Sequence, residues 1–446
     1  MLNWEQVTLG HELTDDAEGR KGTAHATLSL MSRAVPEAVG ELPKSAQHER
    51  PWLFAFLIAP DAVISLGLVS GALTFLLRNE GVDPGRAATI SALIALPHAI
   101  YFLWGPITDF WFQRRYWIFA ASVAAAALLV CAFGLARLGT TLGVSLLFLV
   151  ASIAVLSPAA CGGMMATLTS EVNRRRASSF YQVGSLAIGA VAVYAITSLA
   201  GRISLRVIGL IVAAMILLPA LFAFEARSEP LIQTRTVQET VALIFDECKA
   251  TFWRWEAIPY LLIVTGPAGS GAMIGLLGAI ARDYGVTGQQ VGWINGVAGA
   301  LLTSAGALAA SLIPAKVPAP IAYLVCTIIN AATLAVFALG PMRPAVYFSG
   351  TIFYLFTVGT CYALTTAVIL EMMGASGKSG SGRYSVVNSL ANVPVAYMIW
   401  LDGRGYALWG TRGMPAMDLV VSAVAASVLL AHFVVSRRRR RARMVA

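Results

Sequence analysis

Charged side chains are scarce in this sequence. Asp, Glu, Lys and Arg make up only 12% of its 446 residues, whereas 57% are hydrophobic and the mean hydropathy is +0.72. A soluble globular protein carries about 25% charged residues. So few charges cannot cover the surface of a soluble chain of this length. The composition therefore excludes an ordinary soluble protein and indicates a membrane protein.

Sequence motifs of nucleotide hydrolysis, peptide or ester hydrolysis and metal binding are also missing. The GxxxxGK[ST] phosphate loop does not occur, which argues against ATP-driven chemistry. Neither HExxH nor GxSxG occurs, and the five cysteines form no CxxC pair and no His-Cys spacing typical of a metal site. We therefore expect no enzyme activity, no cofactor and no metal centre.

Long apolar stretches account for most of the chain. A helix needs about 20 apolar residues to cross a bilayer, and some of the stretches are longer, which implies tilt. A β-barrel would require strands of about ten residues with alternating polarity, and the sequence has no such alternation. The twelve predicted spans are 52–78, 85–111, 115–136, 142–168, 177–200, 203–225, 257–283, 288–313, 318–340, 345–373, 380–402 and 414–436.

The apolar stretches fall into two matching sets. The GxxxG pair Gly67–Gly71 recurs 204 positions later as Gly271–Gly275, and a second echo ends at Glu171 and, 200 positions later, at Glu371. We interpret both GxxxG pairs as sites of close helix packing. Matching halves rich in spans are typical of secondary transporters. The sequence thus predicts an all-α membrane protein with twelve transmembrane helices in two pseudo-symmetric six-helix halves.

Basic residues are distributed unevenly between the two sides of this arrangement. With both termini on one side, that side carries 23 of the 32 Lys and Arg residues. The asymmetry predicts a bacterial inner-membrane protein with both termini in the cytoplasm. The net charge of +9 therefore favours contact with anionic lipid over nucleic-acid binding. The predicted parts are a disordered cytoplasmic tail (1–51), a six-helix half (52–225), a cytoplasmic linker with an amphipathic helix (226–256), a second six-helix half (257–436) and a basic cytoplasmic tail (437–446).

One stretch of the second span resembles a known family. Leu96–Trp117, LPHAIYFLWGPITDFWFQRRYW, combines Leu-Pro, Phe-Leu-Trp-Gly-Pro, an Asp and a basic pair. This combination resembles the signature of the AmpG-like branch of the major facilitator superfamily, and a looser resemblance extends over 52–436. The branch includes the bacterial muropeptide permease, eukaryotic acetyl-CoA transporters and some siderophore permeases. The resemblance implies two halves that rock against each other to carry a solute.

The same stretch holds a partial form of the superfamily's loop motif, Gly-x-x-x-Asp-x-x-Gly-x-(Arg/Lys). Gly105, Asp109 and Arg114 fit this motif, whereas Phe112 replaces its second Gly. The resemblance implies that the acid caps a neighbouring helix end and locks the inward side shut. An acid near a membrane edge is stable against Arg or a helix N-terminus. The start of the eleventh span, near Gly382, is a candidate partner.

Further charges mark the cytoplasmic ends of the spans. Glu171 lies beside Arg174, and Glu371 precedes Lys378 and Arg383. We interpret these groups as inner-gate salt bridges that form and break as the halves rock. Plain interfacial charges are the alternative interpretation.

Asp61 is the one acid deep in a predicted span, nine residues or about 14 Å from Trp52. It follows Pro60, which is expected to interrupt the helix. An acid at this depth is stable when it is paired or protonated, and this suits a proton carrier. His98 lies at a similar depth in the second span, so the two could relay a proton or bind substrate together. The alternative for Asp61 is a protonated acid that is hydrogen-bonded to a neighbouring helix. The alternative for His98 is a histidine that serves only to bond one helix to another.

Polar residues within spans are the candidate substrate contacts. Asn388 and Asn392 lie one turn apart in the eleventh span, and Asn295 lies in the eighth. Gln182 is near the start of the fifth span, and Tyr101 fits a cavity wall in the second. Buried amides in lipid need partners, so these side chains are expected to face other helices or a cavity.

Together these features predict an inner-membrane secondary active transporter, proton-coupled, that imports a small polar solute such as a peptidoglycan fragment. The alternatives are a permease for a siderophore or a CoA-type solute, and a multidrug exporter. A non-transporting sensor or assembly factor that uses the same fold is a further alternative. We expect a monomer in the bilayer whose partners are a small-molecule substrate, lipid and protons, with no nucleic acid.

Overall fold

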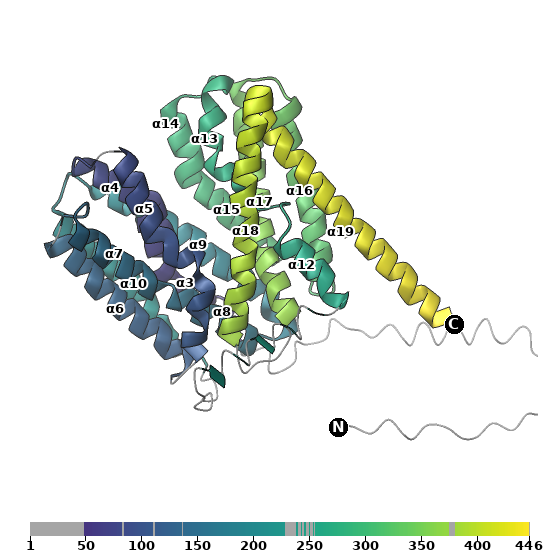
Figure 1. The fold of residues 1–446 in the computed structure, drawn as a ribbon, viewed down its shortest axis with the longest axis horizontal. Helices are drawn as coiled ribbons and strands as arrows, with labels where there is room; N and C mark the ends of the chain where they lie inside the picture. The colour runs from purple at the N-terminus through teal and green to yellow at the C-terminus, as the bar shows by residue number, and fades with distance from the viewer. Residues whose placement is uncertain are drawn as a thin grey trace, which may run out of the picture. The chain divides into compact units, whose positions relative to one another are not determined.

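The computed structural model describes residues from Glu49 to Val445, which belong to one compact unit. The gaps are at 83, 110–111, 136, 374–379 and most of 228–254. The expected disordered tail and most of the expected amphipathic linker helix lie outside the described residues. The described part is helical, and its one β-type pairing is an isolated bridge between Ala200 and Ile203 (Figure 1).

The first half contains the six predicted helical segments, four of them built from more than one piece. Side-chain caps begin two of the helices: Thr140 accepts a hydrogen bond from the main chain of Gly143, and Ser204 from that of Val207. The elements are α3 (Leu53–Ala62), η1 (Val63–Ala72) and α4 (Leu73–Asn79); α5 (Pro84–Ala99), η2 (Tyr101–Leu103) and η3 (Gly105–Asp109); α6 (Arg114–Leu135); α7 (Thr141–Ala154) and α8 (Leu156–Leu168); α9 (Glu171–Leu199); and α10 (Leu205–Ala220) with η4 (Leu221–Glu225).

Pro60 does not break the first span as expected. It lies buried inside α3, and the helix continues through Ala62 into η1, which is a ten-residue π-helix. Proline removes one main-chain donor and crowds the carbonyl one turn earlier. A wider π turn is one of the known ways in which a helix absorbs such a disturbance. The span therefore remains continuous past Asp61.

The second half also follows the predicted order of helical segments. Its elements are η5 (Trp255–Ala257), α12 (Ile258–Val264), η6 (Ala272–Gly275), α13 (Leu277–Ile280) and η7 (Ala281–Tyr284); α14 (Gly288–Val291), η8 (Gly292–Val297) and α15 (Ala298–Ala310); α16 (Ala319–Leu339); α17 (Pro344–Met373); α18 (Gly380–Trp409) with η9 (Gly410–Arg412); and α19 (Gly413–Val445).

The seventh predicted span is interrupted between α12 and η6. Gly269 and Gly271 have φ values of 71° and 75°, in the left-handed region that side chains other than glycine rarely adopt. Pro267 precedes them and has no main-chain N–H to donate. Gly271 lies in this interruption rather than in a helix, and a Cβ there would lie 2.1 Å from the hydroxyl of Tyr362, so its close packing is against α17.

Nine helical stretches among the described residues are long and apolar enough to cross a membrane. One of them, Ser381–Ser436, has 56 residues, which at 1.5 Å per residue is about 84 Å and far exceeds one bilayer. It comprises α18 and α19, which pack against each other and account for two predicted spans. The second span is the shorter apolar helix Thr89–Leu103. The all-α membrane fold is confirmed, whereas the count of twelve is visible only in part.

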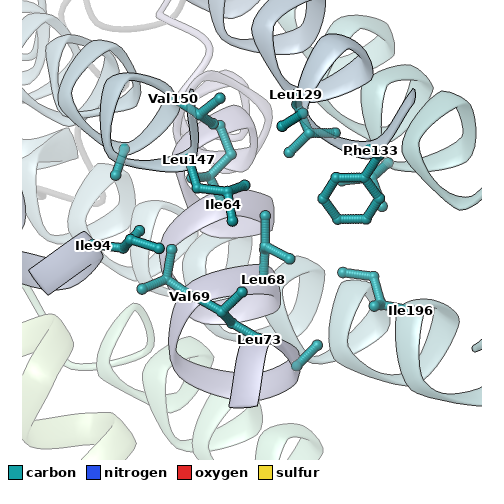
Figure 2. Close-up of a cluster of buried hydrophobic side chains, with 14 of the residues drawn as sticks. Ile64, Leu68, Val69, Leu73, Ile94, Leu129, Phe133, Leu147, Val150 and Ile196 are labelled. Carbon is teal, nitrogen blue, oxygen red and sulfur yellow. The ribbon is translucent and has the colours of Figure 1, made fainter. Parts of the chain in front are cut away.

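The core of the first half is organised around η1, as Figure 2 shows. Side chains of η1 pack against residues contributed by α5, α6, α7 and α9. Because lipid tails are as apolar as these side chains, close van der Waals packing rather than burial from water stabilises the contact. The labelled members are Ile64, Leu68, Val69, Leu73, Ile94, Leu129, Phe133, Leu147, Val150 and Ile196.

The first GxxxG pair serves helix packing, as predicted. A Cβ on Gly67 would lie 2.5 Å from Ala192 Cβ of α9, and one on Gly71 would lie 2.2 Å from Val193 Cγ2. Both distances are too short for real contacts, so only glycine allows η1 and α9 to approach this closely.

Gly67→Leu is therefore expected to destabilise the folded protein by about 1–3 kcal/mol, because the added side chain overpacks the η1–α9 contact. The measurement is the thermal midpoint of the detergent-solubilised protein by size-exclusion chromatography after heating. Ser70→Leu, at an exposed position of the same helix, is the matched control. Equal midpoints for the two variants would contradict the prediction.

Candidate functional site

Asp61 and His98 lie in direct contact. The Nε2 atom of His98, near the end of α5, is 2.9 Å from Oδ1 of Asp61 in α3. The Ser65 hydroxyl, one turn further along, donates to the main-chain carbonyl of Asp61 at 2.9 Å and lies 3.2 Å from its Oδ2. Asp61 is 7% exposed. The structure thus joins the two predicted proton-coupling residues by one hydrogen bond, whose proton can reside on the carboxyl or on the imidazole.

Three tyrosines from different helices are clustered beside this pair. Tyr101 of η2, Tyr181 of α9 and Tyr384 of α18 are buried and lie within electrostatic range of one another. Tyr101 and Tyr181 are also within range of Asp61. A Cβ on Gly162 of α8 would lie 2.0 Å from the ring of Tyr384, so this glycine makes room for the ring. Because Tyr384 comes from the second half, the cluster packs the two halves together next to Asp61.

The other predicted substrate contacts do not all lie in the same part of the molecule. Gln182 Nε2 donates to Thr366 Oγ1 of α17 at 3.0 Å, which joins the two halves. Asn388 is half-buried one turn after Tyr384 on α18, and Asn392 is exposed. Asn295 Nδ2 lies 3.1 Å from the hydroxyl of Tyr347, within the second half. The structure therefore gathers Tyr101, Gln182 and Asn388 around the interface and places Asn295 in a separate set of contacts.

The predicted gate residues Asp109 and Arg114 are both buried and paired. Arg114 Nη2 is 2.8 Å from Asp109 Oδ1, and its Nε donates to Ser381 Oγ at 2.8 Å. The Asp109 carboxylate also accepts the main-chain N–H groups of Ser381 at 3.2 Å and Gly382 at 3.0 Å. It thus caps the N-terminus of α18, where the helix dipole favours a negative charge. A Cβ on Gly105 would clash with this same helix.

A second link between the halves is made by Arg175 of α9. Its Nη1 donates to the carbonyls of Ile313 at 3.0 Å and Pro314 at 2.8 Å, and its Nη2 donates to that of Val317 at 2.5 Å. These carbonyls follow the C-terminal end of α15, where main-chain oxygens lack helical partners and attract a cation. Sequence reasoning named the neighbouring Arg174 and did not single out Arg175.

Glu371 supports the same region from within the second half. Its carboxylate accepts the Tyr260 hydroxyl at 3.0 Å and the main-chain N–H of Ala319, the first residue of α16, at 3.0 Å. It also lies within electrostatic range of Arg175. Glu371 therefore interacts electrostatically with Arg175 of the other half.

The remaining predicted gate residues make weaker contacts. Glu171 and Arg174 are 4.0 Å apart, and the Glu171 side chain is 87% exposed. A pair at this distance with one partner in solvent contributes little to stability. Arg383 is buried, and its Nη2 donates to the main-chain carbonyl of Met373 at 3.3 Å. The gating role of these three residues stays a prediction.

Tyrosine hydroxyls bind main-chain carbonyls along the interrupted seventh span. The donors come from three helices, α16, α17 and α18, and replace partners that a continuous helix would have provided. We call these four bonds the tyrosine tethers. They join Tyr397 to Thr265 O (2.9 Å), Tyr323 to Ala268 O, Tyr362 to Ser270 O (3.1 Å) and Tyr347 to Leu277 O (3.1 Å). Sequence reasoning missed them, since tyrosines in apolar helices give no local signal of such a role.

Asp109, Arg114 and Arg175 all join the halves at one end of the helix bundle. The loops at this end of the bundle are those to which the sequence analysis assigned most of the Lys and Arg residues. In this conformation the two halves are therefore held together at the end that the charge distribution assigns to the cytoplasm.

Comparison with solved structures identifies the fold. The human organic anion transporter MFSD10 superposes with a TM-score of 0.60 at 14% identity, covering 87% of this chain and 100% of that one. The proton:xylose symporter XylE gives 0.59 at 14%, with 85% and 94% covered. The E. coli fucose:proton symporter FucP gives 0.59 at 15%, with 86% and 98% covered. The fold is that of the major facilitator superfamily.

The comparisons at the level of sequence give no closer relative. No protein-family model matches the chain, and no curated protein matches it either. At identities of 14–15%, the solved structures share the fold alone.

Arg175→Ala is expected to loosen the link between the halves, because three carbonyls after α15 lose their donor. Cys161, buried in the interface cluster beside Tyr384, is the reporter, in a variant whose other cysteines are replaced by serine. We expect its alkylation rate in membranes to rise by about tenfold, the equivalent of one lost charged hydrogen bond.

Arg176→Ala is the matched control, because Arg176 is exposed on the same helix. This variant is expected to leave the Cys161 rate unchanged. An unchanged rate in Arg175→Ala as well would contradict the role given to Arg175.

Proposed function

We propose that this protein is a proton-coupled secondary active transporter that imports a small polar solute. The observation that carries the proposal is the hydrogen bond between Asp61, which is buried, and His98, which is half-buried, inside a membrane fold next to the interface of its halves. Buried ionisable groups in membrane spans are costly and are found mostly where ions or protons move. A carboxyl and an imidazole in hydrogen-bond contact are groups that can pass a proton between them.

The fold supports transport by alternating access. Two of the three neighbours reported above carry the name of proton symporter, one for xylose and one for fucose, and the third is named an organic anion transporter. Their named solutes differ, so the fold favours coupled transport without favouring one cargo. The choice of solute must rest on residues of this chain.

A peptidoglycan fragment is the solute that we favour. The support is the resemblance of Leu96–Trp117 to the AmpG-like branch, together with polar groups such as Asn388 and Gln182 near the interface. The buried arginines among the described residues are Arg114, Arg174, Arg175 and Arg383, and all four lie near helix starts at the end assigned to the cytoplasm. They do not form a cationic clamp at mid-membrane depth, so a polyanion such as CoA is the less favoured cargo.

The proposed cycle starts from the conformation described here, with the cytoplasmic end held shut by Asp109 and Arg175. A proton binds at Asp61 and His98, and solute binds beside the tyrosine cluster. Neutralising the buried carboxylate lowers the cost of moving it between the two access states. The links of Asp109 and Arg175 then break, and solute and proton leave to the cytoplasm. We place the protein in a bacterial inner membrane, as a monomer with both termini in the cytoplasm.

Asp61→Asn is expected to abolish proton-driven accumulation. The experiment is uptake of labelled anhydro-muropeptide into proteoliposomes under an imposed inward proton gradient. The amide cannot bind and release a proton, so accumulation is expected to fall by about tenfold or more. Exchange of internal for external solute needs no net proton movement, so it is expected to persist.

Asp283→Asn serves as the matched control, since Asp283 is an exposed acid whose recorded bond is to Thr411. It should accumulate solute like the wild type. Gradient-driven uptake that survives Asp61→Asn would overturn the coupling role of Asp61. Uptake of a siderophore instead of the muropeptide would change the cargo and keep the mechanism. Absence of flux with all these solutes, together with capture of a protein partner, would favour the sensor or assembly factor.

A further inference from the structure

A second pair of carboxylates is buried in the second half, away from the groups used above. Asp402 lies in α18 and Asp418 lies in α19, on either side of the turn η9 that joins the two helices. Asp402 is 0% exposed and Asp418 is 3% exposed. Each falls near the end of a predicted span, which is why hydropathy alone did not single them out.

Close contact between α18 and α19 brings the two acids to the same level. A Cβ on Gly405 would lie 2.3 Å from the carbonyl oxygen of Gly413, and one on Gly413 would lie 2.0 Å from that of Gly405. The two main chains therefore touch beside the acids. Asp418 acts on Asp402 electrostatically, which places the two carboxylates within each other's field.

The two acids differ in how their oxygens are satisfied. Asp418 Oδ1 accepts the Ser422 hydroxyl at 2.9 Å. Both carboxylate oxygens of Asp402 are buried, and neither has a hydrogen-bond partner among the described residues. A buried polar atom without a partner costs about 1–3 kcal/mol, and more when it is charged. A missing donor is therefore the unexplained feature of this site.

The groups that face the pair supply no positive charge. From α17, Tyr354 is within range of both acids, and its hydroxyl is bonded to the main chain of Met273 in η6. The neighbouring arginines are engaged elsewhere: Arg404 stacks over the ring of Trp400, and Arg412 donates to the carbonyl of Gly340. In the part of the chain that is described, the charged group acting on Asp402 is thus the like-charged Asp418.

We propose that Asp402 and Asp418 form a buried proton-binding site that holds one proton at neutral pH, with Asp402 as its protonated member. Two ionised carboxylates buried within reach of each other's charge repel each other and lack solvation, so such a site is stable when it holds a proton. Protonation removes the charge from the carboxylate whose oxygens have no donor. The site lies where α18 contacts α19, and Tyr354 of α17 connects it to Met273 of η6.

The first test is infrared spectroscopy of the full-length protein at neutral pH, which detects the C=O stretch of a protonated carboxyl. The Asp61→Asn background removes the other candidate carboxyl, so failure here is separable from failure of the transport proposal. We expect a protonated-carboxyl band in this background, its loss in Asp402→Asn or Asp418→Asn, and its persistence in the exposed control Asp283→Asn. A band that survives both pair substitutions overturns the proposal.

The second test is the thermal midpoint against pH. If the folded protein holds a proton that the unfolded chain releases, stability falls as pH rises. Asp402→Asn, an isosteric mimic of the neutral acid, is expected to fold and to reduce this slope by about half or more. Misfolding of both Asn variants, or an unchanged slope, overturns the proposal. A thermal midpoint that changes with sodium concentration at constant pH also overturns the proposal, because it indicates that the pair binds a metal cation instead of a proton.

Discussion

Charged side chains of the first half that bind helix ends of the second half determine the conformation seen here. Asp109 places a negative charge on the N-terminus of α18, and Arg175 places a positive charge on the carbonyls that follow α15. Each charge meets the helix end of opposite polarity. The partners are main-chain atoms, so the links depend on where the two helices end rather than on side chains of the second half. Their geometry sets how the halves meet around Asp61.

This arrangement divides the chemistry between the halves. The first half supplies Asp61 and His98 for coupling and the charges of Asp109 and Arg175 that bind across the interface, whereas the second half supplies the helix ends that receive them, the tyrosine tethers and the ring of Tyr384. The sequence repeat therefore does not imply functional symmetry. Gly67 packs a helix against α9, but its counterpart Gly271 has a left-handed conformation inside an interruption. Equal spacing of glycines led to different structures because Pro267 and Gly269 precede only the second of them.

A feature could be predicted from the sequence when residues close together in the sequence determine it. Apolar length and charge asymmetry are local, so the helical segments could be predicted from the sequence. The contact of Asp109 near Gly382 followed from a family resemblance over a short motif. Arg175 could not be chosen from three consecutive arginines, because only the packing of α9 decides which side chain reaches the other half. Asp402 was missed because its burial depends on the partner helix α19 rather than on its own neighbours in the sequence.

The interrupted seventh span has a mechanical consequence. A continuous helix resists bending because its hydrogen bonds run in one unbroken ladder, and losing one strains the next. Here separate hydroxyl groups from three helices hold four carbonyls between Thr265 and Leu277, so each bond can release without loading its neighbours. We therefore expect this segment to bend more easily than a continuous helix. How easily it bends then depends on how many of the four tyrosine tethers are formed at a given moment.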